Sequence, residues 1–507
     1  MTAVRAAGAS GQGGAVLAID QGTTGTTCLV VDRSGQVTGR GYREITPHFP
    51  HPGWVEHDAT EIFERTIAAA RDALAQARAA GAAPPVCIGI TNQRETIVLW
   101  DRATGVPVHR AIVWQDRRTA ARCAELASHA DTIRARTGLV VDPYFSATKL
   151  EWLLARPGVR ERAERGELLA GTIDTWLVWK LTGGAVHATD HTNASRTMLY
   201  DIDRRAWCDE LLALFSVPRG LLPDVRPSSG DFGNAQAKHI GVALPILGVA
   251  GDQQAALFGQ GGWGVGTVKN TYGTGAFLLL NAGPVRPSPR GGILTTIACD
   301  ATGAPVFALE AAIFIAGAAV QWLRDGLGII DTAPETEPLA RSLTGNDGVY
   351  FVPALVGLGA PDWEPDARGT IVGLTRGTTR AHLARAALEA MAYSTLDVLE
   401  DMRSSAGATL SAMRVDGGAA SNDWLMQFQA DVAGIEVERS DLVETTALGA
   451  AGLAGIAAGV WPDAATFTEA RQFVRFSPGE ARAAALAAHA GWRRAVRATL
   501  GWARDTG

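Results

Sequence analysis

Two segments with one pattern, far apart in the chain, constrain the fold most strongly. Residues 15–32 (AVLAIDQGTTGTTCLVVD) and 268–281 (VKNTYGTGAFLLLN) each read as an apolar strand, a turn of glycine and threonine, and a second apolar strand. The tip of such a hairpin presents backbone N–H groups and hydroxyls, which suit phosphate oxygens. Gly22 and Gly273 stand 251 residues apart, about half of the 507-residue chain. Either hairpin alone is equally well an ordinary small turn, but the pair indicates a repeated phosphate-binding element.

A phosphate hairpin at the start of each half predicts two related domains that face one nucleotide, which is the arrangement of the actin-like ATPase fold. Apolar strands alternate with amphipathic helices, so the class is α/β. We expect two actin-like (ribonuclease H-like) domains with an active-site cleft between them. Residues 1–14 should form a disordered tail, 15–260 the N-terminal domain with the first hairpin, and 261–507 the C-terminal domain with the second. The glycine-rich stretch 259–266 suits a hinge at that boundary.

Composition excludes several other classes of protein. The net charge is −6 and no long basic run occurs, which argues against a nucleic-acid surface or a polybasic membrane patch. No Gly-Lys dipeptide exists, so a Walker-type phosphate loop is excluded. The five cysteines are scattered, as in a reducing cytoplasm. The longest apolar run, 447–461, is too short for an integral membrane segment and predicts a buried helix with closely approaching neighbours.

Secondary structure follows from hydrophobic periodicity. Residues 86–92 read as a buried strand, and residues 60–80 as an amphipathic helix with Thr60 as its N-cap. A second strand, 245–254, also ends in polar residues, and residues 382–403 read as a long helix. Polar side chains at strand ends are where ligands bind in such folds.

A set of motifs spread in order along nearly the whole chain resembles the glycerol kinases of the FGGY carbohydrate kinase family. The set includes DQGTT, PGWVEHD, GITNQRET, IVWQDRRT, DPYFSATK, TNASRTMLYDI, GVAGDQQAALFGQ, KNTYGTG and RVDGGAASN. The resemblance implies ATP-dependent phosphorylation of glycerol to sn-glycerol 3-phosphate in glycerol catabolism, with Mg2+, in a cytoplasmic homodimer or homotetramer. Two alternatives remain open at this point: a related kinase for another polyol or ketose, and an actin-like ATPase without a small-molecule acceptor.

The alcohol site is expected around Arg94 and Glu95, which follow the strand 86–92. A guanidinium donates to two oxygens, whereas a carboxylate accepts from two hydroxyls. The resemblance assigns both residues to glycerol, adds the Tyr144 hydroxyl, and makes Trp114 and Phe277 the apolar wall. The alternatives are a structural ion pair for the charged residues and core packing for the aromatic ones.

Asp252 and Gln253 end the strand 245–254. A carboxylate there can accept the alcohol proton as the phosphoryl group arrives. The resemblance makes Asp252 the general base and Gln253 a hydroxyl contact. From the residues alone, Asp252 is equally suited to cap the helix that follows.

The nucleotide site is expected to be divided between the halves. The resemblance places phosphates at the two hairpin tips and the nucleoside against small residues of the second half. Asp20 resembles the aspartate that organises Mg2+, usually through water. The nucleotide contacts expected are Thr23, Thr24, Gly25 and Thr27 of the first hairpin, Thr274 and Gly275 of the second, and Gly317, Gln321, Gly418 and Asn422.

Several positions depart from the family pattern. Many relatives carry arginine or lysine where this chain has Thr27, and an aromatic residue where it has Asp362. Residues 228–245 lack the glycine- and lysine-rich loop that binds fructose 1,6-bisphosphate in some relatives, so control by that effector is not expected. His239 lies near the position where some relatives carry a histidine that becomes phosphorylated, but the register differs, and it is interpreted as a surface residue. The remaining clustered histidines form no recognised metal-ligand set and are interpreted as structural or loop residues: His48, His51, His57, His187 and His191.

Overall fold

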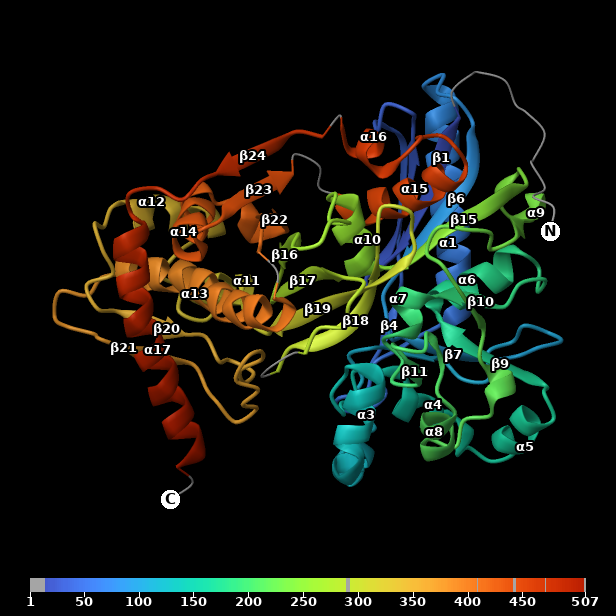
Figure 1. The fold of residues 1–507 in the computed structure, drawn as a ribbon, viewed down its shortest axis with the longest axis horizontal. Coiled ribbons are helices and arrows are strands. Elements are labelled where there is room, and N and C mark those ends of the chain that lie inside the picture. Colours follow the sequence, from blue (N-terminus) through green and yellow to red (C-terminus); the bar gives the residue numbers. More distant parts are fainter. Residues whose placement is uncertain (1–13, 289–291, 408, 441–443, 470, 506–507) are drawn as a thin grey trace.

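The computed structural model describes residues 14–288, 292–407, 409–440, 444–469 and 471–505. The tail predicted at 1–14 therefore falls, except for its last residue, outside the described residues. The two halves of the chain lie side by side, the first in blue to green and the second in yellow to red (Figure 1). Within the described part of the chain, all five cysteines are buried free thiols, and no helix has the length and apolar character needed to cross a bilayer.

The first half is built on a six-stranded sheet of order β14-β15-β6-β1-β2-β3. Strands β1, β2 and β3 pair antiparallel, whereas β6 and β15 continue from β1 in parallel. The strands are β1 (Ala15–Gln21), β2 (Gly25–Val31), β3 (Val37–Glu44), β6 (Pro85–Asn92), β14 (Asn234–Ala235) and β15 (Leu244–Gly251).

The second half repeats this plan in a seven-stranded sheet of order β18-β19-β17-β16-β22-β23-β24. Strands β16, β17 and β19 pair antiparallel, and β22 and β23 continue from β16 in parallel, as β6 and β15 do from β1. The expectation of two related α/β halves is therefore confirmed. The strands are β16 (Val268–Tyr272), β17 (Ala276–Gly283), β18 (Leu294–Cys299), β19 (Pro305–Ile313), β22 (Ala412–Asp416), β23 (Glu436–Ser440) and β24 (Phe473–Phe476).

Both predicted hairpins form, and their turns are closed in the same way. The Gly22 N–H donates to the carbonyl of Gly25 at 2.9 Å, and the Gly273 N–H donates to that of Gly275 at 2.8 Å. A Cβ atom built on Gly25 or Gly275 would lie within 3 Å of a carbonyl oxygen near the end of the third antiparallel strand. Each half therefore uses glycine where its phosphate hairpin meets the neighbouring backbone.

Helix α15 (Thr445–Ala457) comes from the second half of the sequence but packs on the sheet of the first half, beside β1, β6 and β15 (Figure 1). A Cβ atom on Gly449 would overlap the Ala255 carbonyl oxygen, and one on Gly89 would overlap that of Ala450. Glycine is needed at both positions because the backbones nearly touch. The predicted buried helix with closely approaching neighbours is confirmed.

The remaining helices pack around the two main sheets and around the smaller sheets of the first half. Helix α1 begins one residue earlier than predicted, and its N-cap is Asp58, whose carboxylate accepts from the N–H groups of Thr60 and Glu61. The prediction of Thr60 as N-cap was wrong because the preceding aspartate can reach both free N–H groups. The helices are α1 (Ala59–Ala79), α2 (Ala120–Glu125), α3 (Ala130–Thr137), α4 (Ser146–Leu154), α5 (Val159–Glu164), α6 (Ile173–Leu181), α7 (His191–Ala194), α8 (Asp209–Leu214), α9 (Ala237–Ile240), α10 (Asp252–Gly259), α11 (Gly317–Asp325), α12 (Thr336–Arg341), α13 (Arg380–Ala406), α14 (Asp423–Ala433), α16 (Ala464–Glu469) and α17 (Arg482–Arg504).

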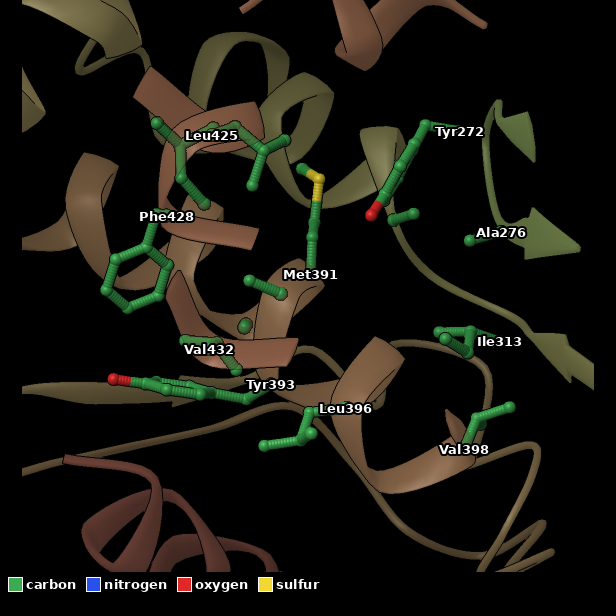
Figure 2. Packing of buried hydrophobic residues seen from close by; sticks show 14 of the residues in the cluster. Tyr272, Ala276, Ile313, Met391, Tyr393, Leu396, Val398, Leu425, Phe428 and Val432 are labelled. Atoms are coloured by element: carbon green, nitrogen blue, oxygen red, sulfur yellow. The ribbon is translucent and has the colours of Figure 1, made fainter. Parts of the chain in front are cut away.

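The core of the second half supports the second hairpin. Figure 2 shows side chains of α13 and α14, among them Met391 and Leu425, in one cluster with Tyr272 and Ala276 from β16 and β17. The buried Tyr272 hydroxyl donates to Gln429 Oε1 at 2.7 Å. Hydrophobic packing and this hydrogen bond therefore hold the hairpin against the helices.

A smaller sheet in the first half carries the loop with Trp114. Its order is β4-β5-β8-β7-β9. Its strands are β4 (Pro47–His48), β5 (Glu56–His57), β7 (Ile97–Asp101), β8 (Ala111–Ile112) and β9 (Leu168–Thr172). The remaining short strands form two-stranded pairs: β10 (Ala188–Asp190) with β13 (Asp224–Arg226), β11 (Tyr200–Asp201) with β12 (Ala206–Trp207), and β20 (Tyr350–Val352) with β21 (Thr370–Val372).

Candidate active site

Arg94 and Glu95 lie just past the carboxyl end of β6, and both are buried. Glu95 has a φ of 61°, in the left-handed region that residues other than glycine rarely adopt. Such strained backbone persists only where the surrounding structure holds it in place, and it is found mainly at functional sites. Here it lets both neighbouring side chains join one buried group of charges.

That group contains two residues that the sequence did not identify as site residues, Arg196 and Glu310. Arg94 Nη1 and Nη2 donate to the two carboxylate oxygens of Glu310 at 2.7 and 2.9 Å. Arg196 Nε donates to Glu95 Oε1 at 2.6 Å, and its Nη2 lies 3.1 Å from Glu310 Oε1. Burial raises the pKa of Glu95, opposed by the two guanidinium groups. The four side chains form one buried ionic cluster, which we call the arginine–glutamate quartet.

An aromatic cavity of about 590 Å3 lies beside the quartet. Its lining includes Trp114, Tyr144, Phe277 and Glu310, so the three expected aromatic residues come together around one space. The rings of Trp114 and Tyr144 meet edge to face, with centroids 5.5 Å apart. Trp114 Nε1 donates to Thr23 Oγ1 at 2.9 Å, which joins the cavity wall to the tip of the first hairpin.

Asp252 is the first residue of α10, and Gly251 occupies the N-cap position. Asp252 Oδ1 accepts from the N–H of Gln253 at 2.7 Å and lies 3.1 Å from Arg94 Nε. Burial raises the pKa of Asp252, against the effects of Arg94 and the Gln253 N–H. Gln253 is held from the second half, because the Lys269 ammonium donates to its Oε1 at 2.7 Å. Lys269, which the sequence did not identify as a site residue, is fully buried.

Asp20, near the end of β1, stands opposite Thr27 in the β1–β2 ladder. Burial, Asp252 and Glu444 together raise the pKa of Asp20 to about 8. A carboxylate whose ionisation is opposed by neighbouring carboxylates is a site where a divalent cation would relieve repulsion. No group of three or more side chains suited to hold a metal occurs among the described residues. One or two carboxylates fit Mg2+, which keeps several waters and takes further oxygens from a phosphate ligand.

A second cavity, of about 500 Å3, lies in the second half. Gly418 offers open space there, since a Cβ atom on it would meet nothing within 4 Å. Asn422 Oδ1 caps α14 by accepting from the Leu425 N–H at 2.9 Å. The cavity is lined by five residues expected to contact the nucleotide, namely Thr274, Gly317, Gln321, Gly418 and Asn422.

The tips of both hairpins reach solvent. Thr24 and Thr274 are exposed, whereas Gly25 and Gly275 behind them are buried. The carbonyl of Thr274 accepts from the N–H of Ala316 at 2.8 Å, which ties the second tip to the start of α11. The nucleotide residues expected from sequence thus lie at two hairpin tips and in one cavity, except Thr27, which lies within β2 between Asp20 and Tyr42.

Three residues that the sequence analysis set apart from the site, His239, Asp362 and His191, make structural contacts. His239 is half-buried rather than on the surface, with its ring edge-on to Phe63 at 5.2 Å. The Asp362 carboxyl is partly buried close to Asp397, and burial and that charge raise its pKa. His191 Nδ1 lies 2.6 Å from the Tyr200 hydroxyl, a structural contact.

A repeated sheet, a phosphate-type hairpin in each half and a buried ionic cluster beside an aromatic cavity define a two-domain kinase of the actin-like type. Comparison with known proteins agrees. The N-terminal domain of the FGGY family of carbohydrate kinases matches residues 15–259, and its C-terminal domain matches residues 268–458.

The chain therefore belongs to the FGGY family of carbohydrate kinases and, within it, groups with the glycerol kinases. A glycerol kinase of Dechloromonas aromatica is 55% identical over 495 residues, or 97% of this chain and 98% of the relative. The crystal structure of Plasmodium falciparum glycerol kinase with ADP superimposes with a TM-score of 0.92 at 34% identity, covering 96% of this chain and 98% of that one. A ligand-bound xylulose kinase from Lactobacillus acidophilus shares the fold, with a TM-score of 0.86 at 20% identity and coverage of 96% and 98%.

Proposed function

We propose that this protein transfers the γ-phosphoryl group of ATP to glycerol, giving sn-glycerol 3-phosphate and ADP in glycerol catabolism. The observation that carries the proposal is that the half-buried Asp252, from a distant part of the sequence, meets the buried neighbours Arg94 and Glu95 beside the aromatic cavity. Relatives that are more than half identical over nearly the whole chain are glycerol kinases, which supports the same substrate.

In the proposed reaction, Arg94 and Glu95 hold hydroxyls of the triol while Trp114 and Phe277 cover its carbon atoms. Asp252 accepts the proton of the third hydroxyl as that oxygen forms a bond to the γ-phosphorus. The bond from the γ-phosphorus to the β,γ-bridging oxygen breaks, and ADP leaves with that electron pair. Gln253, fixed by Lys269, contacts a hydroxyl of the substrate.

Phosphate oxygens are proposed to meet the two hairpin tips, with the nucleoside in the cavity of the second half. Asp20 would hold Mg2+ with Asp252 nearby, and the bound ion would neutralise phosphate charge. Closure of the two domains over both ligands would exclude water and limit hydrolysis of ATP. We further propose that the protein is cytoplasmic, which the free thiols support, and that it forms a homodimer or homotetramer, which the resemblance to the family supports.

A coupled assay of ADP release with glycerol, erythritol and xylulose tests the proposed substrate. We expect kcat/KM for glycerol to exceed that for each of the others by at least about 100-fold, because unpaired buried polar groups penalise an ill-fitting polyol. A clear preference for erythritol or xylulose would assign the chain to another polyol or ketose. ADP release that does not depend on any polyol would favour an actin-like ATPase instead.

Gly418→Leu tests the nucleotide cavity. The added side chain has open space in front of it, so it should fill the cavity without disturbing the fold. We expect KM for ATP to rise about tenfold, equivalent to about 1.4 kcal/mol, while KM for glycerol stays unchanged. Steady-state kinetics with each substrate varied in turn would show this. An unchanged KM for ATP would remove Gly418 from the nucleotide site.

A further inference from the structure

Glu310 brings the second half of the chain into the candidate alcohol site. It lies within β19, and only 3% of the residue is exposed. Its two carboxylate oxygens accept from the two terminal nitrogens of Arg94, which belongs to the first half. A bidentate pair of this kind fixes both the position and the plane of the guanidinium group. The orientation of Arg94 is thus set from the opposite half of the molecule.

A second contact supports the same bridge. Gln254 Oε1 accepts from Arg94 Nη1 at 3.2 Å, and Gln254 Nε2 donates to the carbonyl of Ile297 on β18 at 3.0 Å. Strands β18 and β19 form an antiparallel pair that runs between the two halves (Figure 1). The β18–β19 hairpin therefore contacts Arg94 both directly and through Gln254.

The charges of the quartet balance only when Glu310 is included. Arg94 and Arg196 carry two positive charges, and Glu95 and Glu310 carry two negative charges. Burial opposes ionisation of Glu310, but Arg196 and Arg94 hold its pKa at about 2, so it is charged at neutral pH. A neutral triol brings no charge of its own, so a buried site that binds it must be balanced by the protein.

Glu310 also determines which guanidinium N–H groups remain available. Within the described part of the chain, Arg94 Nε and both terminal nitrogens of Arg196 are buried without a hydrogen bond. Arg94 Nε and Arg196 Nη2 each lie 3.1 Å from a carboxylate oxygen, of Asp252 and Glu310 respectively, so Arg196 Nη1 is the nitrogen of these three with no ion-pair contact. Arg94 Nε faces Asp252, and the Arg196 guanidinium carbon lies 5.5 Å from the centroid of the Tyr144 ring. Buried donors without acceptors are costly, and hydroxyl oxygens of a polyol are suitable acceptors.

We propose that Glu310 is a positioning residue of the alcohol site: by pairing with Arg94 and Arg196 from the second half, it fixes the orientation in which Arg94 Nε and Arg196 Nη1 meet the hydroxyls of the substrate. The inference rests on the proposed function, because it takes the cluster to be the site of a polyol. It adds that the ionic part of the alcohol site, and not only its apolar wall, is completed from the second half, so that binding the polyol depends on how β19 is placed against the first half.

The test is Glu310→Gln, which keeps the size of the side chain and removes its charge. We expect KM for glycerol to rise about 100-fold, a typical cost of truncating one partner of a buried charge pair, with kcat lowered by no more than about tenfold. KM for ATP should change by less than about threefold. Glu310→Asp keeps the charge but withdraws the carboxylate by one methylene group, so it cannot reach both arginines; KM for glycerol should rise about tenfold.

Glu438→Gln is the matched control. Glu438 is also a buried glutamate on a strand of the second sheet, and its oxygens accept from Arg414 Nε and Arg475 Nε, each at 3.1 Å. This variant should lose some thermal stability, less than Glu310→Gln because Arg475 is largely exposed, but keep KM for glycerol. If the Glu310 variants lose stability like the control and retain the wild-type KM for glycerol, Glu310 is structural and the inference is overturned.

If Glu310→Gln does not fold, Glu310→Asp is used instead: a wild-type KM for glycerol in that variant overturns the inference. Measuring the wild-type protein first separates the two proposals. Failure of the wild type to phosphorylate glycerol contradicts the proposed function. A wild type that phosphorylates glycerol, with Glu310 variants that bind it normally, contradicts only the positioning role.

Discussion

Replacement of Asp252 by asparagine is expected to lower kcat for glycerol phosphorylation by a factor of about 100 or more, the range that loss of a general base typically costs. The amide has nearly the same shape, and it can still accept from the Gln253 N–H at the start of α10. It cannot take a proton from the attacking hydroxyl. The fold and substrate binding should therefore survive while the chemical step slows.

Steady-state kcat and KM for both substrates, with a thermal melt, measure this effect. The control is Asp209→Asn, since Asp209 is likewise the first residue of a helix, α8, but is exposed and pairs with Arg219 at 3.2 Å. That variant should keep wild-type kcat. An Asp252→Asn enzyme that retains more than about a tenth of wild-type kcat would remove Asp252 from the role of base.

The raised pKa of Asp252 gives this prediction a second readout. A carboxyl with a raised pKa loses its proton only at a higher pH than an exposed aspartic acid, so the base form is lost earlier on acidification. Wild-type kcat should therefore begin to fall at a pH above the ordinary range of aspartate. A pH profile of kcat for the wild type and Asp209→Asn should show the same acid limb.

The sequence predicted the fold where local signals are strong. Both hairpins were predicted because each combines apolar strands with a glycine-rich turn, and the strand 86–92 and the helix 382–403 have clear periodicity. Helix α15 was expected to be buried, but the sheet on which it packs was not predicted. The small residues of the helix indicate a close approach without indicating which sheet is approached. The packing of α15 on the sheet of the first half is determined by the tertiary fold, which local sequence patterns do not reveal.

The candidate site likewise contains residues that local sequence signals identify and one that only the tertiary fold places there. Arg94, Glu95, Asp252 and the hairpin threonines follow strand ends or sit in turns, where polar residues stand out. Glu310 lies inside an apolar strand, and only the pairing of β19 with β17 and β18 determines where its carboxylate points. A lone carboxylate within VFALEAAIFI was the available signal, since a charge in a buried strand needs a partner.

Replacement of Arg94 by methionine is expected to combine the largest loss of function with a large loss of stability. Both terminal nitrogens of Arg94 pair with Glu310, so its removal leaves that buried carboxylate with Arg196 as its remaining ion-pair partner. Breaking a buried ion pair on one side costs about 3–5 kcal/mol of unfolding free energy. We expect kcat/KM for glycerol to fall at least about 1,000-fold, because a hydroxyl contact is lost and the quartet is no longer neutral.

The double variant Arg94→Met with Glu310→Met separates these two effects. It removes one charge of each sign and leaves Arg196 paired with Glu95 at 2.6 Å, so the cluster is neutral again. Replacing a buried ion pair by apolar side chains is often close to neutral for stability, so denaturant unfolding should show most of the lost free energy restored. Glycerol phosphorylation should not return, because the donor that faces Asp252 is still missing. If activity returned together with stability, Arg94 would be a structural cation and the candidate alcohol site would have to lie elsewhere.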